Sequence, residues 1–486
     1  MHPLLTRRPL LGLPALLLGG RARAAGPLFP WGVASGDPRP DGLVLWTRLD
    51  AADATAVEVT WEVAADDGFR HVLRRGQVAA RPEEAHSLHV ELAGLPADRH
   101  LWFRFHAQGQ RSAVGRTRTA PAPGADAAIR FLNAGCQNFE HGFYTAWAHA
   151  AAMEDLHFIF HYGDSIYEGA GRQRPGGWGP LVRAHEGGRC RSLADYRARH
   201  AQYLSDPDWQ AARAAHPLVC SADDHEVDNN WAGDHTPRPF PEDGFPARRD
   251  AALQAWWEHM PLPRAARERA FRRLRFGRHL SLHVLDTRRH RTPQACGDGV
   301  RPRCEEWADP ARAMLGAAQE SWLAEGLRRG AGWQVLAQQV VLAHRLLSGD
   351  RLSMDAWDGY PAARTRLLEM LRGHDAAVLT GDVHRAWAND VAEGPGAAPV
   401  AAEFVATSIT SEGDGSAAQP SAPEVMARNP WMKFHSNLRG FTWHEAGAAS
   451  LQARFMAVPY VTRPGAPLEE AGRAVALRGR PGVEIV

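Results

Sequence analysis

Hydrophobic and polar positions alternate along the first hundred or so residues of the chain. Short alternating or apolar runs occupy residues 43–48, 57–63, 88–92, 101–106 and 113–117. Turn-forming pairs such as Asp37-Pro38 and Asp41-Gly42 separate them. Period-two runs with frequent turns are typical of antiparallel sheets. They predict a small fibronectin- or immunoglobulin-like β-sandwich over residues 26–121, followed by a Pro- and Gly-containing linker at 119–124.

The pattern changes after the linker. Apolar strands are expected at residues 129–134, 158–160, 217–219, 280–285, 335–342, 376–379 and 404–409. Apolar residues at helical spacing occupy residues 143–153, 193–203, 311–327 and 362–371. Strands that alternate with helices favour a layered α/β domain. We assign it to residues 127–465 and expect a C-terminal tail over 466–486.

The N-terminus has the layout of an export signal. Arg7 and Arg8 form a twin-arginine pair, an apolar run covers residues 10–18, and Ala22 and Ala24 supply the small residues of a cleavage site. Residues 1–25 are therefore predicted as a signal peptide read by the twin-arginine (Tat) export machinery, with a periplasmic or secreted product. An uncleaved anchor or a chance Arg pair is the alternative. No later segment is apolar enough to suggest a membrane span in the mature protein.

Composition and cysteine content narrow the class of protein to which the chain can belong. The hydrophobic fraction of 44% and the charged fraction of 23% are ordinary for a globular protein. A formal charge of +1 gives no basic field of the kind that a nucleic-acid partner needs. Of the five cysteines, Cys296 and Cys304 flank a short Gly-containing loop that a disulfide could close. Whether Cys190 and Cys220 form a second disulfide is left open, and Cys136 is the one cysteine without a candidate partner.

Side chains able to bind metals follow four of the predicted strands. They are Cys136 after 129–134, Asp164 and Tyr167 after 158–160, Asp223, Asp224, His225 and Glu226 after 217–219, and Asp382 and His384 after 376–379. In open α/β sheets the loops at the carboxyl ends of the strands form the ligand crevice. Four such loops in one domain predict a shared metal centre.

These residue types fit the hydrolysis of phosphate esters. Two cations about 3.5–4 Å apart can clamp the ester oxygens and activate a water molecule. Asp164 is the candidate bridging carboxylate, and we also count it among the catalytic residues. The thiolate of Cys136 and the phenolate of Tyr167 suit a redox-active or trivalent metal such as iron, whereas Asp224 and Asp382 suit calcium or magnesium. His225 is then available as the general acid for the leaving alkoxide.

Six strings around these residues form a recognisable set: NAGCQNF, HYGDSIYEG, SADDHEVDNNW, DAWDGYPAAR, TGDVHRAW and SITSEGDG. They resemble the alkaline phosphatase D (PhoD-like) family of the calcineurin-like metallophosphoesterase superfamily. The opening FPWGVASGDPRPDGLVLWTRL resembles the N-terminal region of the same family. The resemblance implies a four-layered α/β/β/α core behind the N-terminal sandwich. It also implies an iron–calcium centre, with iron as Fe³⁺.

Carried over residue by residue, the resemblance implies the following ligands. Cys136, Asp164, Tyr167 and His384 would bind iron, and Asp164, Asp224 and Asp382 would bind calcium, with Asp223 and Asn229 as further calcium or outer ligands. The chain departs from many superfamily members by Gly135-Cys136-Gln137 in place of Asp-x-His, and by Gly381-Asp382-Val383-His384 in place of Gly-His-x-His. Both departures disfavour zinc or manganese.

The sequence therefore predicts an exported dinuclear-metal phosphoesterase that hydrolyses a small-molecule or lipid phosphate ester with a metal-activated water. Phosphomonoesters are the first expectation and diesters the second. The alternatives are a phosphodiesterase or phospholipase D-like enzyme on the same centre and, more remotely, a secreted binding module. Arg288 and Tyr360 are candidate substrate-binding residues, with a packing role as the alternative for each. A serine hydrolase is disfavoured because no G-x-S-x-G motif occurs.

Overall fold

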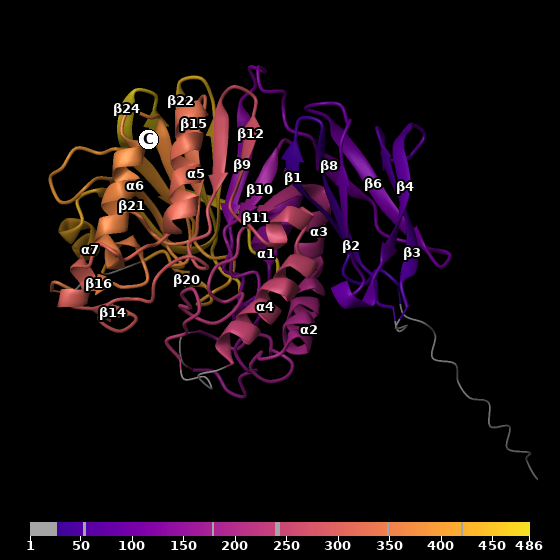
Figure 1. Ribbon diagram of the computed structural model, residues 1–486, viewed down its shortest axis with the longest axis horizontal. Coiled ribbons are helices and arrows are strands. Elements are labelled where there is room, and N and C mark those ends of the chain that lie inside the picture. Colours follow the sequence, from indigo (N-terminus) through magenta and orange to yellow (C-terminus); the bar gives the residue numbers. More distant parts are fainter. Residues whose placement is uncertain (1–26, 52–54, 177–178, 239–243, 348, 419–420) are drawn as a thin grey trace, which may run out of the picture.

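The computed structural model describes residues 27–51, 55–176, 179–238, 244–347, 349–418 and 421–486 (Figure 1). The predicted signal peptide, residues 1–25, lies outside the described residues. A smaller β-rich part occupies the indigo side of the molecule, and a larger layered domain carries the remaining elements (Figure 1). Among the described residues, no helix combines the length and the apolar character that crossing a membrane requires.

The N-terminal part is a sandwich of two antiparallel sheets. One sheet contains β3 (Val57–Ala64), β4 (Val72–Ala80), β6 (His100–Ala107), β7 (Gln110–Arg111) and β8 (Gly115–Arg118). The facing strands are β1 (Val33–Arg39), β2 (Gly42–Arg48) and β5 (Ser87–Leu92). Inward residues of both sheets, such as Leu45, Val59, Val90 and Phe103, form one buried cluster. The sandwich was predicted, although β1, β4 and the short β7 were not.

The sandwich is continuous with the larger domain. Strand β1 pairs in parallel with β11 (Pro217–Cys220), with Ser35 opposite Pro217 and Gly36 opposite Leu218. One sheet of the sandwich is therefore also the edge of a sheet in the larger domain. The boundary near residue 121 is a boundary in sequence but not a break in the hydrogen-bonded sheet.

The larger domain contains two mostly parallel sheets. The first runs β9 (Ile129–Ala134), β10 (Phe158–His161), β11 and β1. The second runs β13 (Leu280–Val284), β15 (Trp333–Ala337), β17 (Ala376–Thr380) and β19 (Ala401–Val405), with β12 (Arg272–Phe276) and β18 (Ala386–Val391) added antiparallel. Because parallel strands end at one edge of a sheet, the loops after β9, β10, β11 and β17 can meet.

Strand β21 (Met432–Ala446) connects the two sheets, since its first part pairs with β18 and its last part with β9. It is followed by β22 (Ser450–Val458), β23 (Glu469–Leu477) and β24 (Arg480–Ile485). The predicted C-terminal tail, residues 466–486, is thus an antiparallel hairpin. Its inward residues are small, Ala474 and Ala476, so their alternation is weak in the sequence.

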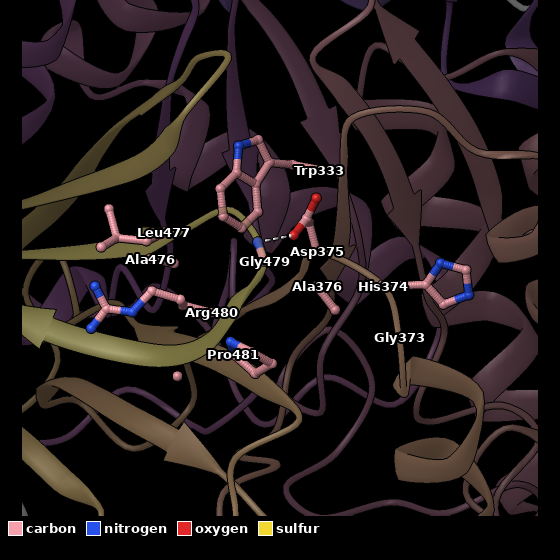
Figure 2. A pocket seen from close by; sticks show the side chains of 11 residues that line it. Trp333, Gly373, His374, Asp375, Ala376, Ala476, Leu477, Gly479, Arg480 and Pro481 are labelled. Atoms are coloured by element: carbon pink, nitrogen blue, oxygen red, sulfur yellow. Dashed lines mark hydrogen bonds between the residues drawn. The ribbon is translucent and has the colours of Figure 1, made fainter.

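The hairpin also borders a cavity of about 170 Å³ (Figure 2). Asp375 accepts a hydrogen bond from the Gly479 N–H at 2.7 Å there (Figure 2). Asp375 precedes β17, so this cavity lies at the amino end of that strand, opposite to the predicted metal ligands. It belongs to the packing of the hairpin against the domain.

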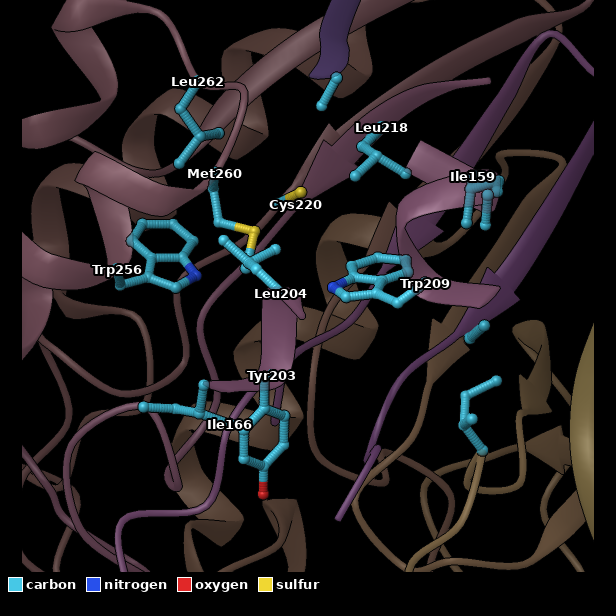
Figure 3. Close-up of a cluster of buried hydrophobic side chains, with 14 of the residues drawn as sticks. Ile159, Ile166, Tyr203, Leu204, Trp209, Leu218, Cys220, Trp256, Met260 and Leu262 are labelled. Atoms are coloured by element: carbon cyan, nitrogen blue, oxygen red, sulfur yellow. The ribbon is translucent and has the colours of Figure 1, made fainter. Parts of the chain in front are cut away.

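Strand periodicity builds the layers. On β10, Phe158 and Phe160 point between the two sheets, and Ile159 points to the helices on the outer face. That face is covered by α1 (Thr145–Ala151), α2 (Leu193–Leu204), α3 (Pro207–Ala215) and α4 (Phe245–His259). Figure 3 shows Trp209 and Trp256 in this core together with Ile159 and Leu218.

The second sheet is covered by α5 (Gly316–Arg329) and α6 (Pro361–Leu371), whose Leu323 and Leu367 pack with Val378 of β17. The order helix, sheet, sheet, helix confirms the predicted fold class. A short helix, α7 (Ala422–Arg428), and the short strands β14 (Val300–Arg301), β16 (Leu352–Ser353) and β20 (Gly415–Ser416) complete the chain.

Some predicted elements are displaced. The strand expected at 335–342 ends at Ala337. The apolar run continues past it because residues 340–343 are a buried loop, which has the same hydrophobic character as a strand. The strand expected at 404–409 is Ala401–Val405, and the helix expected at 311–327 begins at Gly316. Helices α3 and α4 were not predicted.

Candidate metal centre

The loops after four strands bring the predicted ligands together. The side chains form three groups, and within each group the potential ligand atoms lie within 4.8 Å of one another. The groups are Cys136, Asp164 and His384; Asp164, Asp224 and His225; and Asp223, Asp224 and Asp382. Asp164 and Asp224 each belong to two of the three groups, and Asp164 is the one that joins the Cys136 and His384 side to the Asp224 side. The first group was expected on iron, and Asp224 and Asp382 were expected on calcium.

Sulfur, phenol and imidazole donors gather on one side of Asp164. The Cys136 thiol donates to Asp164 Oδ2 at 3.3 Å, and the Tyr167 hydroxyl lies 3.3 Å from His384 Nε2. Tyr167 is also held by Ser411, whose Oγ lies 2.6 Å from the phenol oxygen. All these side chains are buried. The predicted ligand set Cys136, Asp164, Tyr167 and His384 is thus one contiguous cluster.

The backbone carries strain at this cluster. Cys136, Asp164, Asp382 and His384 have φ values of 50°, 53°, 66° and 53°, in the left-handed region that residues other than glycine rarely adopt. Each such residue costs roughly 1–3 kcal/mol and persists only where the surrounding structure holds it. Such outliers concentrate at functional sites, and four of the thirteen non-glycine residues with positive φ among the described residues are predicted ligands.

Glu226 holds two of the ligand loops together; the sequence placed it among the groups able to bind metal and did not predict this tethering role. Its fully buried carboxylate accepts hydrogen bonds from the N–H groups of Asp164, Ser165 and Asp223, at 3.0, 2.6 and 2.7 Å, and from the Ser165 hydroxyl at 2.7 Å. The loops also touch directly, since a Cβ on Gly163 would lie 2.4 Å from the Cβ of Asp223. Only glycine permits this approach.

His225 is paired with Glu168, a residue quoted in the HYGDSIYEG string but given no role. His225 Nδ1 lies 2.6 Å from Glu168 Oε2, and the ring centroids of His225 and Tyr167 are 4.2 Å apart. Burial alone would lower the pKa of His225, but the carboxylates of Glu168, Asp224 and Asp164 raise that pKa well above its ordinary value. The surrounding carboxylates thus favour the protonated imidazole, which is the form that a general acid needs.

Arg288 is the internal counter-ion of the carboxylate cluster. Its guanidinium is fully buried, donates from Nε to Asp223 Oδ1 at 2.6 Å, and donates from Nη1 to Asp355 at 2.9 Å. Its Nη2 lies 3.6 Å from Asp382 and 3.9 Å from Asp224. Tyr360 is also buried, and its hydroxyl donates to the Thr292 carbonyl at 2.7 Å. Neither side chain is exposed, and substrate contact by Arg288 or Tyr360 stays a prediction.

The donor set fits the binding of cations. Burial, followed by the charges of neighbouring carboxylates, raises the pKa values of Cys136 and Asp382 well above their ordinary ranges. Burial likewise raises the pKa of Asp164. Within the described residues, the buried Oδ2 of Asp223 has no hydrogen-bond partner. Bound cations would satisfy all of these groups at once, because ligands release protons to the solvent when a metal binds.

The remaining predicted positions lie outside the cluster. Asn229 is half-buried and gives its backbone N–H to Glu168 at 3.4 Å, so a ligand role of its side chain stays a prediction. Cys296 and Cys304 form a disulfide, with Cα atoms 5.8 Å apart. Cys190 and Cys220 are buried free thiols, so the structure contains no second bridge between them.

Comparison with known proteins agrees with this arrangement. The PhoD-like phosphatase family matches residues 131–455, and the N-terminal domain of PhoD-like phosphatases matches residues 15–121. Alkaline phosphatase D of Bacillus subtilis (strain 168) is 40% identical over 481 residues, which cover 94% of this chain and 82% of that protein. A solved structure of PhoD superposes with a TM-score of 0.90 at 39% identity, covering 94% of this chain and 92% of that one.

A more distant likeness concerns the fold alone. The purple acid phosphatase PPD1 from yellow lupin (Lupinus luteus) seeds superposes with a TM-score of 0.57 at 13% identity, covering 87% of this chain and 71% of that one. Fold and site together define a phosphoric ester hydrolase of the metallophosphoesterase class. The chain belongs to the PhoD-like phosphatase family.

Proposed function

We propose that this chain is an exported dinuclear-metal phosphoesterase, with iron and calcium as its cations and phosphomonoesters as its first substrates. The observation that carries the proposal is the position of Asp164, which is grouped with Cys136 and His384 on one side and with Asp224 on the other. Thiol, phenol and imidazole donors adjoin it on one side and carboxylates on the other. The first set is typical of iron sites and the second of calcium sites.

Each part of the centre has a separate task in this proposal. Cys136, Tyr167 and His384 would hold iron, and Asp224 and Asp382 would hold calcium, with Asp164 between them. The chemistry that bound cations supply is stabilisation of charge on the phosphate oxygens and activation of a water molecule.

His225 donates its proton to the leaving alkoxide, and Glu168 orients the imidazole and keeps it charged. The buried Arg288 prevents the carboxylates from repelling one another when the loops assemble.

Export rests on the twin-arginine pattern at Arg7 and Arg8, ahead of the apolar run at residues 10–18. The relative named alkaline phosphatase D supports a phosphate ester as the substrate class. A folded enzyme that already holds its cations suits an export route that carries folded proteins. Fractionation of cells that express the full chain tests this part, and a product confined to the cytoplasm would contradict it.

The catalytic part is tested by elemental analysis of the purified mature protein together with a substrate panel. We expect iron and calcium in comparable amounts, and faster hydrolysis of p-nitrophenyl phosphate than of bis(p-nitrophenyl) phosphate or phosphatidylcholine. A rate on a diester that is roughly a hundredfold higher, about 2.7 kcal/mol of barrier, would establish a phosphodiesterase instead. Protein without bound metal and without hydrolysis of any ester would favour a binding module.

A further inference from the structure

A small polar pocket of about 120 Å³ adjoins the His225 side of the metal centre. Its wall comes from the loops after β9, β10 and β11, and includes Asn138, His141, Tyr167, Glu168, His225 and Arg238. Tyr167 and His225 belong both to this wall and to the centre. A group held in the pocket therefore lies next to the imidazole that we assign as the proton donor.

Every charged side chain of the pocket wall already has an ion-pair partner within the protein. Glu140 is paired with Arg172 at 2.7 Å, and Glu168 is paired with both His225 and Arg238. Burial lowers the pKa of His141 to about 3, so this ring is neutral. The Arg172 guanidinium also donates hydrogen bonds to the Gly179 carbonyl at 3.0 Å and to the Pro180 carbonyl, so these N–H groups are not available to a ligand. Because its carboxylates and cations are already paired with one another, the pocket suits a neutral group that can accept and donate hydrogen bonds, such as a hydroxyl.

Two side chains of the wall can donate hydrogen bonds to such a group. Asn138 uses its side-chain oxygen to accept from the Glu140 N–H at 2.9 Å, while its amide nitrogen has no partner among the described residues. Arg238 donates to Glu168 at 3.0 Å and keeps 40% of its side-chain surface exposed. An amide and a guanidinium at one wall suit the hydroxyl oxygens of an alcohol.

We propose that this pocket binds the leaving alcohol of the substrate, and that it selects small hydroxyl-rich alcohols, such as polyols or sugars, through Asn138 and Arg238. The inference rests on the proposed function, because it takes His225 as the proton donor. The leaving oxygen must lie within hydrogen-bond reach of that imidazole. The carbon chain attached to that oxygen then enters the adjoining pocket, where its other hydroxyl groups meet the two donors.

The test compares glycerol 1-phosphate with propyl phosphate, which has the same three-carbon chain without the extra hydroxyl groups. We expect kcat/KM to be at least tenfold higher for glycerol 1-phosphate. One hydrogen bond to a charged donor is worth about a factor of ten to a hundred. Arg238→Ala should therefore lower the ratio of the two kcat/KM values about tenfold, and Asn138→Asp, which keeps the oxygen that accepts from Glu140, should lower it severalfold.

Taking the ratio removes any general effect that Arg238→Ala exerts through Glu168 and His225, since both alcohols are poor leaving groups that need the same acid. Arg366→Ala is the matched control, because Arg366 is 38% exposed and paired with Glu320 at 2.9 Å away from the centre. It should leave the ratio unchanged.

A ratio near one in the unmodified protein, or a ratio that neither variant changes, would overturn the inference while the phosphoesterase function stands. The reference substrate p-nitrophenyl phosphate separates the two failures. If the metal-loaded protein hydrolyses none of the three esters, the proposed function is wrong and the pocket assignment falls with it.

Discussion

Replacing Glu226 by glutamine tests whether one buried carboxylate assembles the metal centre. Glu226 accepts from the N–H groups of Asp164 and Asp223 on one oxygen and from the N–H and hydroxyl of Ser165 on the other. It thereby joins the loop after β10 to the loop after β11. Glutamine has nearly the same shape, but one of its two terminal atoms is an NH₂ donor that must face two N–H or O–H donors.

The magnitude follows from the number of bonds lost. At least two hydrogen bonds to a charged acceptor disappear, each worth about 1.5–3 kcal/mol, which gives roughly 3–6 kcal/mol. The neutral amide offsets part of this loss of free energy, because it avoids the cost of burying a charge. That cost is also why burial raises the pKa of Glu226. We expect the free energy of unfolding to fall by about 3 kcal/mol. Misplacement of Asp164 by about 1 Å should also lower kcat/KM by about a hundredfold.

The assay combines urea unfolding, elemental analysis and turnover. Glu403→Gln is a close control, since Glu403 is also fully buried and accepts four hydrogen bonds, from Leu342, Ala343, Thr380 and Asn389. None of these donors is a predicted ligand. Both variants should lose a similar amount of stability, but only Glu226→Gln should lose metal and turnover.

Two results would refute this reasoning. Full metal content and near-normal turnover in folded Glu226→Gln would show that the loops keep their positions without the carboxylate. Equal loss of metal in Glu403→Gln would show that general destabilisation, rather than the tether between two loops, empties the site.

Three further substitutions probe other parts of the structure. Asp164→Ala should abolish turnover and release one or both metals in elemental analysis, and retained metal with ordinary turnover would contradict its bridging role. His225→Ala should keep its metals and lose about a hundred- to ten-thousandfold in kcat on alkyl phosphates but less on p-nitrophenyl phosphate, whose leaving group needs little protonation; equal losses would argue against the acid role. His444 is fully buried against Phe131, and burial lowers its pKa to about 3. Between pH 3 and 6.5 the unfolded chain binds the proton and the folded chain does not, so stability falls as the pH drops below 6.5. His444→Phe should remove this loss. In urea unfolding, the change in free energy of unfolding caused by the substitution should be about 2 kcal/mol more favourable at pH 5 than at pH 8. An equal change at both pH values would contradict the reasoning.

Local periodicity carried the prediction of the elements around the site. The strand expected at 129–134 is β9, Ile129–Ala134, and the strand expected at 158–160 is β10, Phe158–His161. Such strands are short, buried on both faces and followed within one residue by Gly-Cys or Gly-Asp, so each can be recognised without its neighbours. Helix α4 was missed because Arg248 and Glu258 are buried in it by ion pairs, which hides its apolar face.

The sequence by itself determined the chemical types of the ligands and the strand ends on which they lie, because both depend on residues next to one another in the chain. Only the tertiary structure decided the partners that act across the chain. Arg288 lies 65 residues from Asp223, and Glu168 lies 57 residues from His225. A buried ion pair depends on which loops meet, and a carboxylate that tethers a backbone looks the same in sequence as one that faces water. The continuity of β1 with β11 has the same origin, since strand pairing is set by the packing of whole layers.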